Sequence, residues 1–353
     1  MSRDLNTWTK LVSEKIFEKN DVQEILSILI DDKVNQIEKV KFLIALTKRI
    51  EQPQEVADFS LVLREMAKPL PIPDEIRKEG FIDLCGTGGD GRNTFNVSTC
   101  ASFVIAAAGI KVTKHGNRSI TSKSGGFDLI EAFNITFDVT PKETLECFKK
   151  TNICFIFAQN YHPIFKKIAP LRKAVAKQGY RTIFNLIGPL INPAKPPIQL
   201  LGVPHESWTE CHIEALSLMG LRRAAVVCGK NEKDEYMDEL SPLGPSIWRE
   251  WNGHSFQHKT YSPKNFNFKK GDSKLLEVKS AKESAEIITH ILKGEDKTIR
   301  RDIVALNAGA GLFLTDKVKS LEEGVAVAQE ILASGKAWKK LQQVLDITSR
   351  LKN

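Results

Sequence analysis

The chain has 353 residues, which at about 100–200 residues per domain suggests two structural units or one large α/β domain with an appendage. Its composition is 42% hydrophobic and 27% charged, with 51 basic against 43 acidic residues and a net charge of +8. The basic residues occur in short pairs without interleaved aromatics, which argues against a nucleic-acid-binding protein and favours a lysine-rich solvated surface.

The first 68 residues carry helical patterns. Apolar residues recur at helical spacing in three stretches, over 22–30, 37–44 and 56–66. Prolines at alternate positions then favour an extended connector at Pro69, Pro71 and Pro73. We therefore expect a small helical domain over residues 1–70 and a larger domain over 71–353.

Beyond the prolines, short apolar or β-rich runs alternate with helical stretches. Strands are predicted at Phe81–Cys85, Lys111–His115, Ile153–Phe157, Thr182–Phe184, Leu200–Val203 and Ala224–Cys228. Helices are predicted at Ser98–Ala108, Asp302–Leu312 and Leu321–Ala333. This alternation predicts an α/β fold with a mostly parallel central sheet. The polar helical stretch 163–178 is expected to leave the sheet layer and join the N-terminal helices in space.

Six scattered cysteines without C-x-x-C spacing favour a reducing compartment and argue against a zinc site. The N-terminus lacks an apolar signal segment, and no stretch approaches the roughly 18–20 apolar residues that span a bilayer. We therefore expect a cytoplasmic protein without a membrane or nucleic-acid partner.

The strongest functional signal is a glycine-rich loop directly after the first predicted strand. Gly86–Gly91 reads Gly-Thr-Gly-Gly-Asp-Gly, and the hydroxyl- and amide-rich segment Thr94–Thr99 leads into a helix. Glycines let successive backbone N–H groups face one concavity, and a following helix N-terminus adds positive charge, so the pattern suits a phosphate. The spacing matches neither the dinucleotide fingerprint nor the P-loop.

A second loop follows the next predicted strand. Lys114–Asp128 carries three cations, four hydroxyl side chains and three glycines before another predicted helix. Loops at the carboxyl ends of parallel strands meet at one edge of the sheet, where open α/β sheets bind ligands. We therefore expect the two loops to form one anion site.

Two further sequence elements give weaker evidence of function when each is considered by itself. Asp238 and Glu239 are adjacent carboxylates that suit Mg²⁺, although acidic pairs on loops are often only solvated. Asn160–Pro163 contains an aromatic residue and His162, and Arg172 follows on the next predicted helix. An Arg fork matches a carboxylate, whereas His162 alone also fits a helix cap or the edge of a core.

Taken in order, these strings resemble the anthranilate phosphoribosyltransferases, the tryptophan-pathway members of glycosyltransferase family 3. The strings Gly-Thr-Gly-Gly-Asp-Gly, Asn-x-Ser-Thr, Lys-His-Gly-Asn-Arg, His-Pro and Asn-Leu-x-Gly-Pro-Leu-x-Asn-Pro stand at 86–91, 96–99, 114–118, 162–163 and 185–193. The resemblance covers nearly the whole chain, and it implies Mg²⁺-dependent transfer of phosphoribose from phosphoribosyl pyrophosphate (PRPP) to anthranilate.

The resemblance also implies the residues that hold each ligand. PRPP would be bound by Gly86, Gly89, Asp90, Thr94, Asn96, Val97, Ser98, Thr99, Lys114, His115, Gly116, Asn117, Arg118, Ser119, Ile120, Thr121, Ser122 and Gly126. Anthranilate would be bound by Gly86, Asn117, Arg172, His162 and Pro163, with His115 along its path. Two Mg²⁺ ions would be held by Ser98, Asp238 and Glu239, and the protein would form a homodimer through the helical domain. No residue is assigned as an essential base, because the aromatic amine is already nucleophilic.

The chain departs from the family pattern at two places near these residues. The segment after Arg172 is about three residues longer than the family pattern, and Phe127 stands where a small residue is usual. Three alternatives therefore stay open: another planar acceptor, a pyrimidine-nucleoside phosphorylase, and a non-enzymatic nucleic-acid-binding relative.

Overall fold

The computed structural model describes residues 4–119, 123–268 and 270–352. Four helices begin the chain: α1 (Leu5–Leu11), α2 (Lys19–Ile30), α3 (Gln36–Arg49) and α4 (Pro53–Glu65). The Asn35 side chain caps the start of α3 by accepting a hydrogen bond from the Ile37 N–H at 2.8 Å. Pro53 is the first residue of α4, a position where a backbone N–H has no partner within the helix, so proline is tolerated there. The predicted helical N-terminal segment is therefore confirmed as helical.

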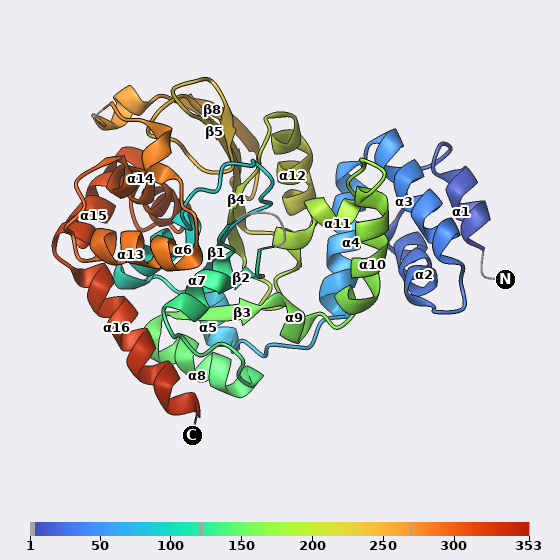
Figure 1. Cartoon of the computed structure of the whole chain (residues 1–353), viewed down its shortest axis with the longest axis horizontal. Coiled ribbons are helices and arrows are strands. Elements are labelled where there is room, and N and C mark those ends of the chain that lie inside the picture. Colours follow the sequence, from blue (N-terminus) through green and yellow to red (C-terminus); the bar gives the residue numbers. More distant parts are fainter. Residues whose placement is uncertain (1–3, 120–122, 269, 353) are drawn as a thin grey trace.

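A mostly parallel sheet forms the centre of the molecule (Figure 1). Its strands are β1 (Ile82–Gly86), β2 (Val112–Gly116), β3 (Ile153–Phe157), β4 (Ile198–Gly202), β5 (Arg223–Lys230), β6 (Tyr236–Met237), β7 (Ser246–Trp251) and β8 (Phe256–Tyr261). The order is β3-β2-β1-β4-β5-β7-β8, and the first five of these strands are parallel. The predicted fold class is confirmed.

One predicted strand is wrong. Thr182–Phe184 lies at the start of the short helix α11 (Ile183–Leu186). The Asn185 side chain accepts hydrogen bonds from the Thr182 backbone at 3.0 Å and from its hydroxyl at 3.1 Å, which begins a helical turn. A three-residue β-rich run is too short to outweigh this local capping.

The antiparallel end of the sheet was not predicted. β7 and β8 pair as a hairpin, and β7 alternates between buried and partly exposed residues. The four residues Asn252, Gly253, His254 and Ser255 form the connection, and Gly253 has a φ of 93°. An Asn-Gly pair between alternating apolar residues is a strong hairpin signal, so the sequence did contain this information.

Alternate residues of the strands enter two different cores, because successive side chains point to opposite faces of a sheet. Ile82, Leu84 and Leu200 pack with α6 (Val97–Ala107) and α14 (Ile299–Leu314). Cys85 and Leu201 pack instead in the core that contains the N-terminal helices and α12 (Ser207–Leu218). Figure 1 shows α14 and α12 on opposite sides of the sheet.

Helix α10 (Phe165–Ala176) leaves the sheet layer and packs against α2 and α3, as Figure 1 shows. Its apolar face buries Ile168, Leu171 and Val175 in the same core as the N-terminal helices. The Lys167 ammonium also donates to Asp32 at 2.7 Å. Residues 163–178 therefore lie where the sequence placed them, whereas the division of the chain into two domains at residue 70 stays a prediction.

The remaining elements surround the sheet. They are α5 (Asp74–Glu79), α7 (Gly126–Ala132), α8 (Pro141–Thr151), α9 (Ala158–Tyr161), η1 (Gly188–Ile191), η2 (Pro263–Phe266), η3 (Ser273–Leu276), α13 (Ala281–Leu292), α15 (Leu321–Ala333), α16 (Lys336–Ser349) and η4 (Arg350–Lys352). Within the described ranges, none of the helices is both long enough and apolar enough to cross a membrane.

The order in which the strands are added to the sheet reverses its direction at β1. The chain moves from β1 to β2 on one side and later returns to β4 on the other side of β1. Connections that diverge in this way open a crevice beyond the carboxyl ends of the strands. The glycine loop follows β1 at this point.

Candidate active site

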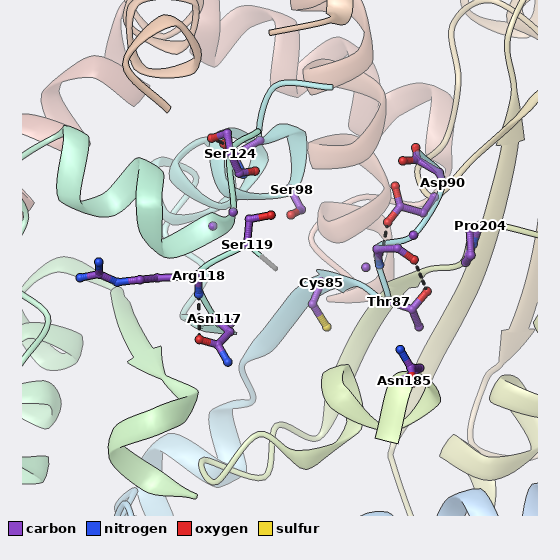
Figure 2. Close-up of a pocket in the computed structure, with 18 of the residues that line it drawn as sticks. Cys85, Thr87, Asp90, Ser98, Asn117, Arg118, Ser119, Ser124, Asn185 and Pro204 are labelled. Carbon is purple, nitrogen blue, oxygen red and sulfur yellow. Dashed lines mark hydrogen bonds between the residues drawn. The ribbon is translucent and has the colours of Figure 1, made fainter. Parts of the chain in front are cut away.

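A cavity of about 1020 Å³ lies at the carboxyl ends of β1 and β2. Its lining includes the predicted donor-site residues Gly86, Gly89, Asp90, Thr94, Asn96, Val97, Ser98, Thr99, Lys114, His115, Gly116, Asn117, Arg118, Ser119 and Gly126. Arg172, Asp238 and Glu239 line it too. Figure 2 shows Thr87, Ser98 and Ser119 around this space. The predicted residues Ile120, Thr121 and Ser122 lie outside the described residues.

The glycine loop needs glycine for two different reasons. Gly88 and Gly89 have φ values of 67° and 93°, which side chains other than glycine rarely adopt. Gly86 is required by close approach, since a Cβ there would lie 2.5 Å from an Asp238 carboxylate oxygen. That same oxygen accepts a hydrogen bond from the Gly88 N–H at 3.1 Å. The loop is thus held to the segment that directly follows β6.

Lys114 carries a positive charge into the floor of the cavity. Its side chain is 6% exposed, and its ammonium donates to the Leu84 carbonyl and, at 3.0 Å, to the Ser98 hydroxyl. Because β2 and the start of α6 meet here, the lysine is fixed close to the hydroxyl. A buried ammonium so placed is suited to an anionic ligand.

The second loop forms one wall of the cavity, but its helix start is already occupied. The Asp128 carboxylate accepts hydrogen bonds from the Ser119 N–H at 2.9 Å and the Gly125 N–H at 2.8 Å. These two amides therefore bind a carboxylate of this chain. Arg118 pairs with Glu131 at 3.0 Å on a half-exposed surface. Phe127 is buried against Phe157, with 4.9 Å between ring centroids.

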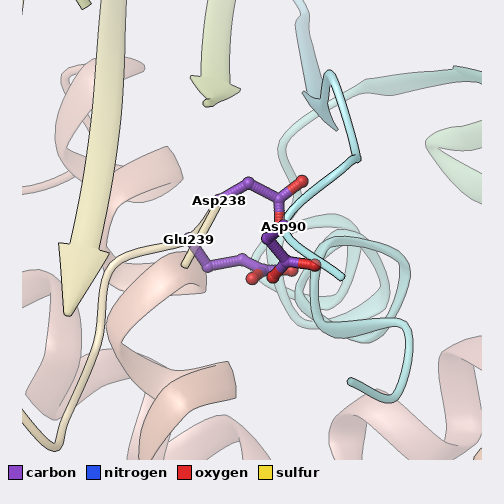
Figure 3. A group of neighbouring side chains, drawn as sticks. All are labelled: Asp90, Asp238 and Glu239. Carbon is purple, nitrogen blue, oxygen red and sulfur yellow. The ribbon is translucent and has the colours of Figure 1, made fainter. Parts of the chain in front are cut away.

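Three carboxylates gather at the mouth of the glycine loop. One oxygen atom from each of Asp90, Asp238 and Glu239 lies within 4.8 Å of the others, and Figure 3 shows the three groups together. Burial and the neighbouring Asp238 raise the pKa of Asp90 to about 7. Burial, Asp238 and Asp90 raise the pKa of Glu239 well above its usual value. The sequence predicted Asp238 and Glu239 as metal ligands and did not reveal that Asp90 joins them.

A second cavity of about 450 Å³ adjoins the first. His115 and His162 line it with their ring centroids 5.7 Å apart. Burial lowers the pKa of His162 to about 4 and that of His115 well below its usual value, so both rings are neutral near pH 7. Pro163, predicted beside His162, is exposed and does not line either of these two cavities.

Arg172 lies where the two cavities meet, because it lines both of them. Gly86 and Asn117 are shared by the two cavities in the same way. Among the residues described in the structure, no acidic side chain pairs with the Arg172 guanidinium, and burial lowers its pKa. An unpaired and partly buried guanidinium at a cavity wall is suited to a carboxylate ligand.

Sequence reasoning missed most of the α10 residues that line the cavities. Lys166, Ala169, Arg172, Lys173 and Ala176 face the two cavities at intervals of one helical turn. The helical spacing of these residues was visible in the sequence. It could not identify them as cavity-lining residues, because the sequence did not show that α10 lies across the carboxyl edge of the sheet. Tyr180 and Trp208, which extend the first cavity, carried no comparable signal.

Comparison with known proteins agrees with this geometry. Residues 78–338 match the family model described as "Glycosyl transferase family, a/b domain". An anthranilate phosphoribosyltransferase of Petrotoga mobilis is 37% identical over 342 residues, which are 97% of this chain and 96% of the relative. The crystal structure of the anthranilate phosphoribosyltransferase of Thermus thermophilus superimposes with a TM-score of 0.87 at 35% identity, covering 97% of this chain and 99% of the other.

The anthranilate phosphoribosyltransferase of Saccharomyces cerevisiae, solved in complex with PRPP and Mg, gives a TM-score of 0.85 at 25% identity and covers 98% of both chains. The fold, the ordered motifs and these likenesses extend over almost the whole length of the chain. The chain belongs to the anthranilate phosphoribosyltransferase family of glycosyl transferases, and it is an enzyme.

Proposed function

We propose that this enzyme transfers the 5-phosphoribosyl group of PRPP to anthranilate in a Mg²⁺-dependent reaction that yields N-(5-phosphoribosyl)anthranilate and pyrophosphate. The observation that carries the proposal is the meeting of two cavities at Gly86 and Arg172. One cavity is lined by phosphate-binding elements, and the other is lined by neutral rings and a free guanidinium. A ribose carbon at this junction would be accessible to an acceptor on one side and its leaving group on the other.

The donor is proposed to bind in the larger cavity. Backbone N–H groups of the glycine loop and the ammonium of Lys114 supply positive charge there. Ser98 and Thr99 stand at the start of α6, where the helix dipole also favours an anion. These groups are in place before binding, so little reorganisation opposes charge development on the departing pyrophosphate.

The carboxylate cluster fits Mg²⁺. Asp90 Oδ2 and Glu239 Oε2 are buried and make no hydrogen bond to any described residue. Burial raises the pKa values of Asp90 and Glu239, and a hard cation, which prefers oxygen ligands, would stabilise the three close carboxylates. We propose that Asp90, Asp238 and Glu239 hold one ion and that Ser98 serves a second one together with the donor phosphates. When bound, Mg²⁺ would neutralise negative charge on the leaving group.

Anthranilate is proposed to occupy the smaller cavity. The Arg172 guanidinium would bind the acceptor carboxylate in a two-point contact, and Asn117 would orient the ring beside Gly86. His115 and His162 would then supply neutral, flat walls. Because the amine is neutral and nucleophilic, these contacts position it and no residue has to remove a proton before attack.

Replacing His162 by asparagine is expected to lower kcat by less than about tenfold, because removal of a general base usually costs about 10²–10⁴-fold. Burial lowers the pKa of His162 to about 4, so its ring is neutral near pH 7. Steady-state kinetics between pH 6 and 8 check this expectation. A loss of about a thousandfold that tracks a single ionisation would identify His162 as a base.

The proposed reaction is tested by mixing the protein with PRPP, Mg²⁺ and anthranilate and following the loss of anthranilate fluorescence. Parallel reactions with other planar aromatic acids test the alternative acceptor, which the longer segment after Arg172 and the bulk of Phe127 keep open. Phosphate-dependent cleavage of a pyrimidine nucleoside without Mg²⁺ would indicate the phosphorylase, and salt-sensitive nucleic-acid binding would indicate the non-enzymatic alternative.

We also propose that the enzyme is a cytoplasmic homodimer joined through the N-terminal helices. Ile37 and Ile50 are 63% and 65% exposed on these helices, which supports an apolar contact there. Six cysteines without disulfide bonds support a reducing compartment. Light scattering of the purified protein tests the dimer, and a monomer at micromolar concentration would contradict it.

A further inference from the structure

Ser284 lies far in the sequence from Asn96, the residue between the glycine loop and α6, but contacts it directly in the fold. It belongs to the first turns of α13, and its side chain is fully buried. Its hydroxyl donates to Asn96 Oδ1 at 2.9 Å and accepts from the Asn96 N–H at 3.2 Å. A single hydroxyl therefore binds both the side chain and the backbone of Asn96.

The Asn96 amide is held on its other side by the second loop. The Ser124 hydroxyl donates to Asn96 Oδ1 at 2.6 Å, and Asn96 Nδ2 donates to the Ser124 carbonyl at 3.1 Å. Asn96 Oδ1 thus receives two hydroxyl donors, which satisfies both of its lone pairs. The amide connects the glycine-loop segment, the second loop and α13.

This arrangement turns Asn96 away from the position that asparagine usually takes at a helix start. Asn96 is the N-cap residue of α6, and asparagine is among the strongest N-cap side chains. Its side chain nevertheless makes no capping hydrogen bond to the first turn of α6. That turn contains Ser98 and Thr99, which line the larger cavity. The Val97 N–H donates to the Phe95 carbonyl at 2.7 Å, and the N–H groups of Ser98 and Thr99 remain available to a ligand.

Neighbouring backbone contacts support the same connection. The Phe95 N–H donates to the Leu276 carbonyl at 2.9 Å, and the Val278 N–H donates to the Asn93 carbonyl at 2.9 Å. The Asn93 side chain accepts from the Lys123 N–H at 3.1 Å. The segment that precedes α13 therefore runs along the donor side of the cavity, and Ser284 within α13 adds the contact with Asn96.

We propose that Ser284 is a positioning residue for the donor. It holds the Asn96 side chain against Ser124 and away from α6, which keeps the first turn of α6 uncapped for a phosphate group and sets the spacing of the two loops. This inference rests on the proposed function, since it names how the PRPP site is prepared.

Ser284→Ala is expected to raise KM for PRPP and the calorimetric Kd of PRPP about tenfold, because a pair of buried hydrogen bonds is lost and Asn96 is released to cap α6. KM for anthranilate should change by less than about twofold, because Asn96 and Ser124 line the larger cavity and not the smaller one. The Tm should not fall by much, since the released Asn96 can stabilise α6 in place of the lost contact.

Ser280→Ala is the matched control. Ser280 caps the same helix by accepting from the Glu283 N–H at 3.2 Å, is exposed, and does not contact Asn96. It should lower the Tm and leave KM for PRPP unchanged. If Ser280→Ala raises KM for PRPP as much as Ser284→Ala does, Ser284 acts only through the order of α13 and the inference is wrong.

A double-mutant cycle tests whether Ser284 acts through Asn96. Asn96→Ala should itself raise KM for PRPP, and adding Ser284→Ala to it should have little further effect. Independent, multiplicative effects would overturn the inference. Wild-type protein that fails to bind PRPP would instead overturn the proposed function, so the two failures are distinguishable.

Discussion

Replacing Arg172 by alanine is expected to lower kcat/KM for anthranilate by about 100-fold or more, whereas the Kd of PRPP should change by less than about twofold. The guanidinium lines both cavities and has no acidic partner among the described residues, so its charge is available to the acceptor carboxylate. Loss of a two-point, charge-assisted contact costs about 3 kcal/mol of binding free energy, which corresponds to a fall in kcat/KM of about 100-fold or more. Steady-state kinetics and calorimetry with PRPP measure the two quantities separately.

Two further variants make the Arg172 experiment specific. Arg172→Lys keeps the charge but lacks the planar fork, so it should recover only part of the loss. Lys177→Ala removes a charge just beyond α10 at an exposed position that lines neither cavity, and it should resemble the wild type. Equal losses of donor and acceptor affinity in Arg172→Ala would mean that the variant is misfolded or that Arg172 has another role.

Replacing Glu239 by glutamine is expected to change activity and stability in opposite directions. Activity with Mg²⁺ should fall by about 100-fold or more, because the cluster loses a charged ligand for the cation. The protein without metal should become more stable above pH 7, because one of three crowded carboxylates is removed. Activity assays and thermal unfolding in EDTA, at several pH values, measure the two effects.

The direction of the pH effect follows from the raised pKa values. Burial and Asp238 raise the pKa of Asp90 to about 7, and burial with both neighbours raises that of Glu239. Between about pH 4 and pH 7 these two carboxyl groups are therefore protonated in the metal-free folded protein and ionised in the unfolded chain, so folding takes up protons. The contribution of this cluster to stability in EDTA should therefore decrease as the pH rises from about 4 to about 7. Glu239→Gln should flatten this decrease.

Glu235→Gln is the control for a nearby acid outside the cluster. Glu235 pairs with Arg92 at 2.9 Å on the surface, and its side chain is 48% exposed. Its replacement should have little effect on activity or on the pH dependence of stability. A Tm difference in EDTA between Glu239→Gln and the wild type that does not grow as the pH rises from 5 to 7, or a Glu239→Gln variant that is fully active, would contradict the metal assignment.

The parallel part of the fold could be predicted because its signals are local. Ile153–Phe157 is apolar throughout, which predicts a buried strand. Phe81–Cys85 is followed directly by the glycine loop, so the sequence also indicated that this loop lies at the carboxyl edge of the sheet. Thr182–Phe184 was misassigned because its helical turn depends on the Asn185 side chain. The glycine loop and the second loop could be found because each is a contiguous string of glycines and hydroxyl side chains.

The parts of the site that were not predicted depend on contacts between distant segments. Asp90 joins Asp238 through the folding of β6 beside the glycine loop. Ser284 reaches Asn96 across 188 positions of the sequence. Burial decides the charge of His162 and Asp90, and neither burial nor these pairings can be deduced from a residue and its immediate neighbours.

The most direct test of the proposed reaction is simultaneous measurement of anthranilate consumption and pyrophosphate release by the wild-type enzyme with PRPP. We predict equal amounts of both, dependent on added Mg²⁺ and abolished by EDTA. Pyrophosphate release that proceeds equally without anthranilate, or well-folded protein that binds PRPP and consumes no anthranilate, would contradict the proposal that the two cavities meeting at Gly86 and Arg172 bring donor and acceptor together.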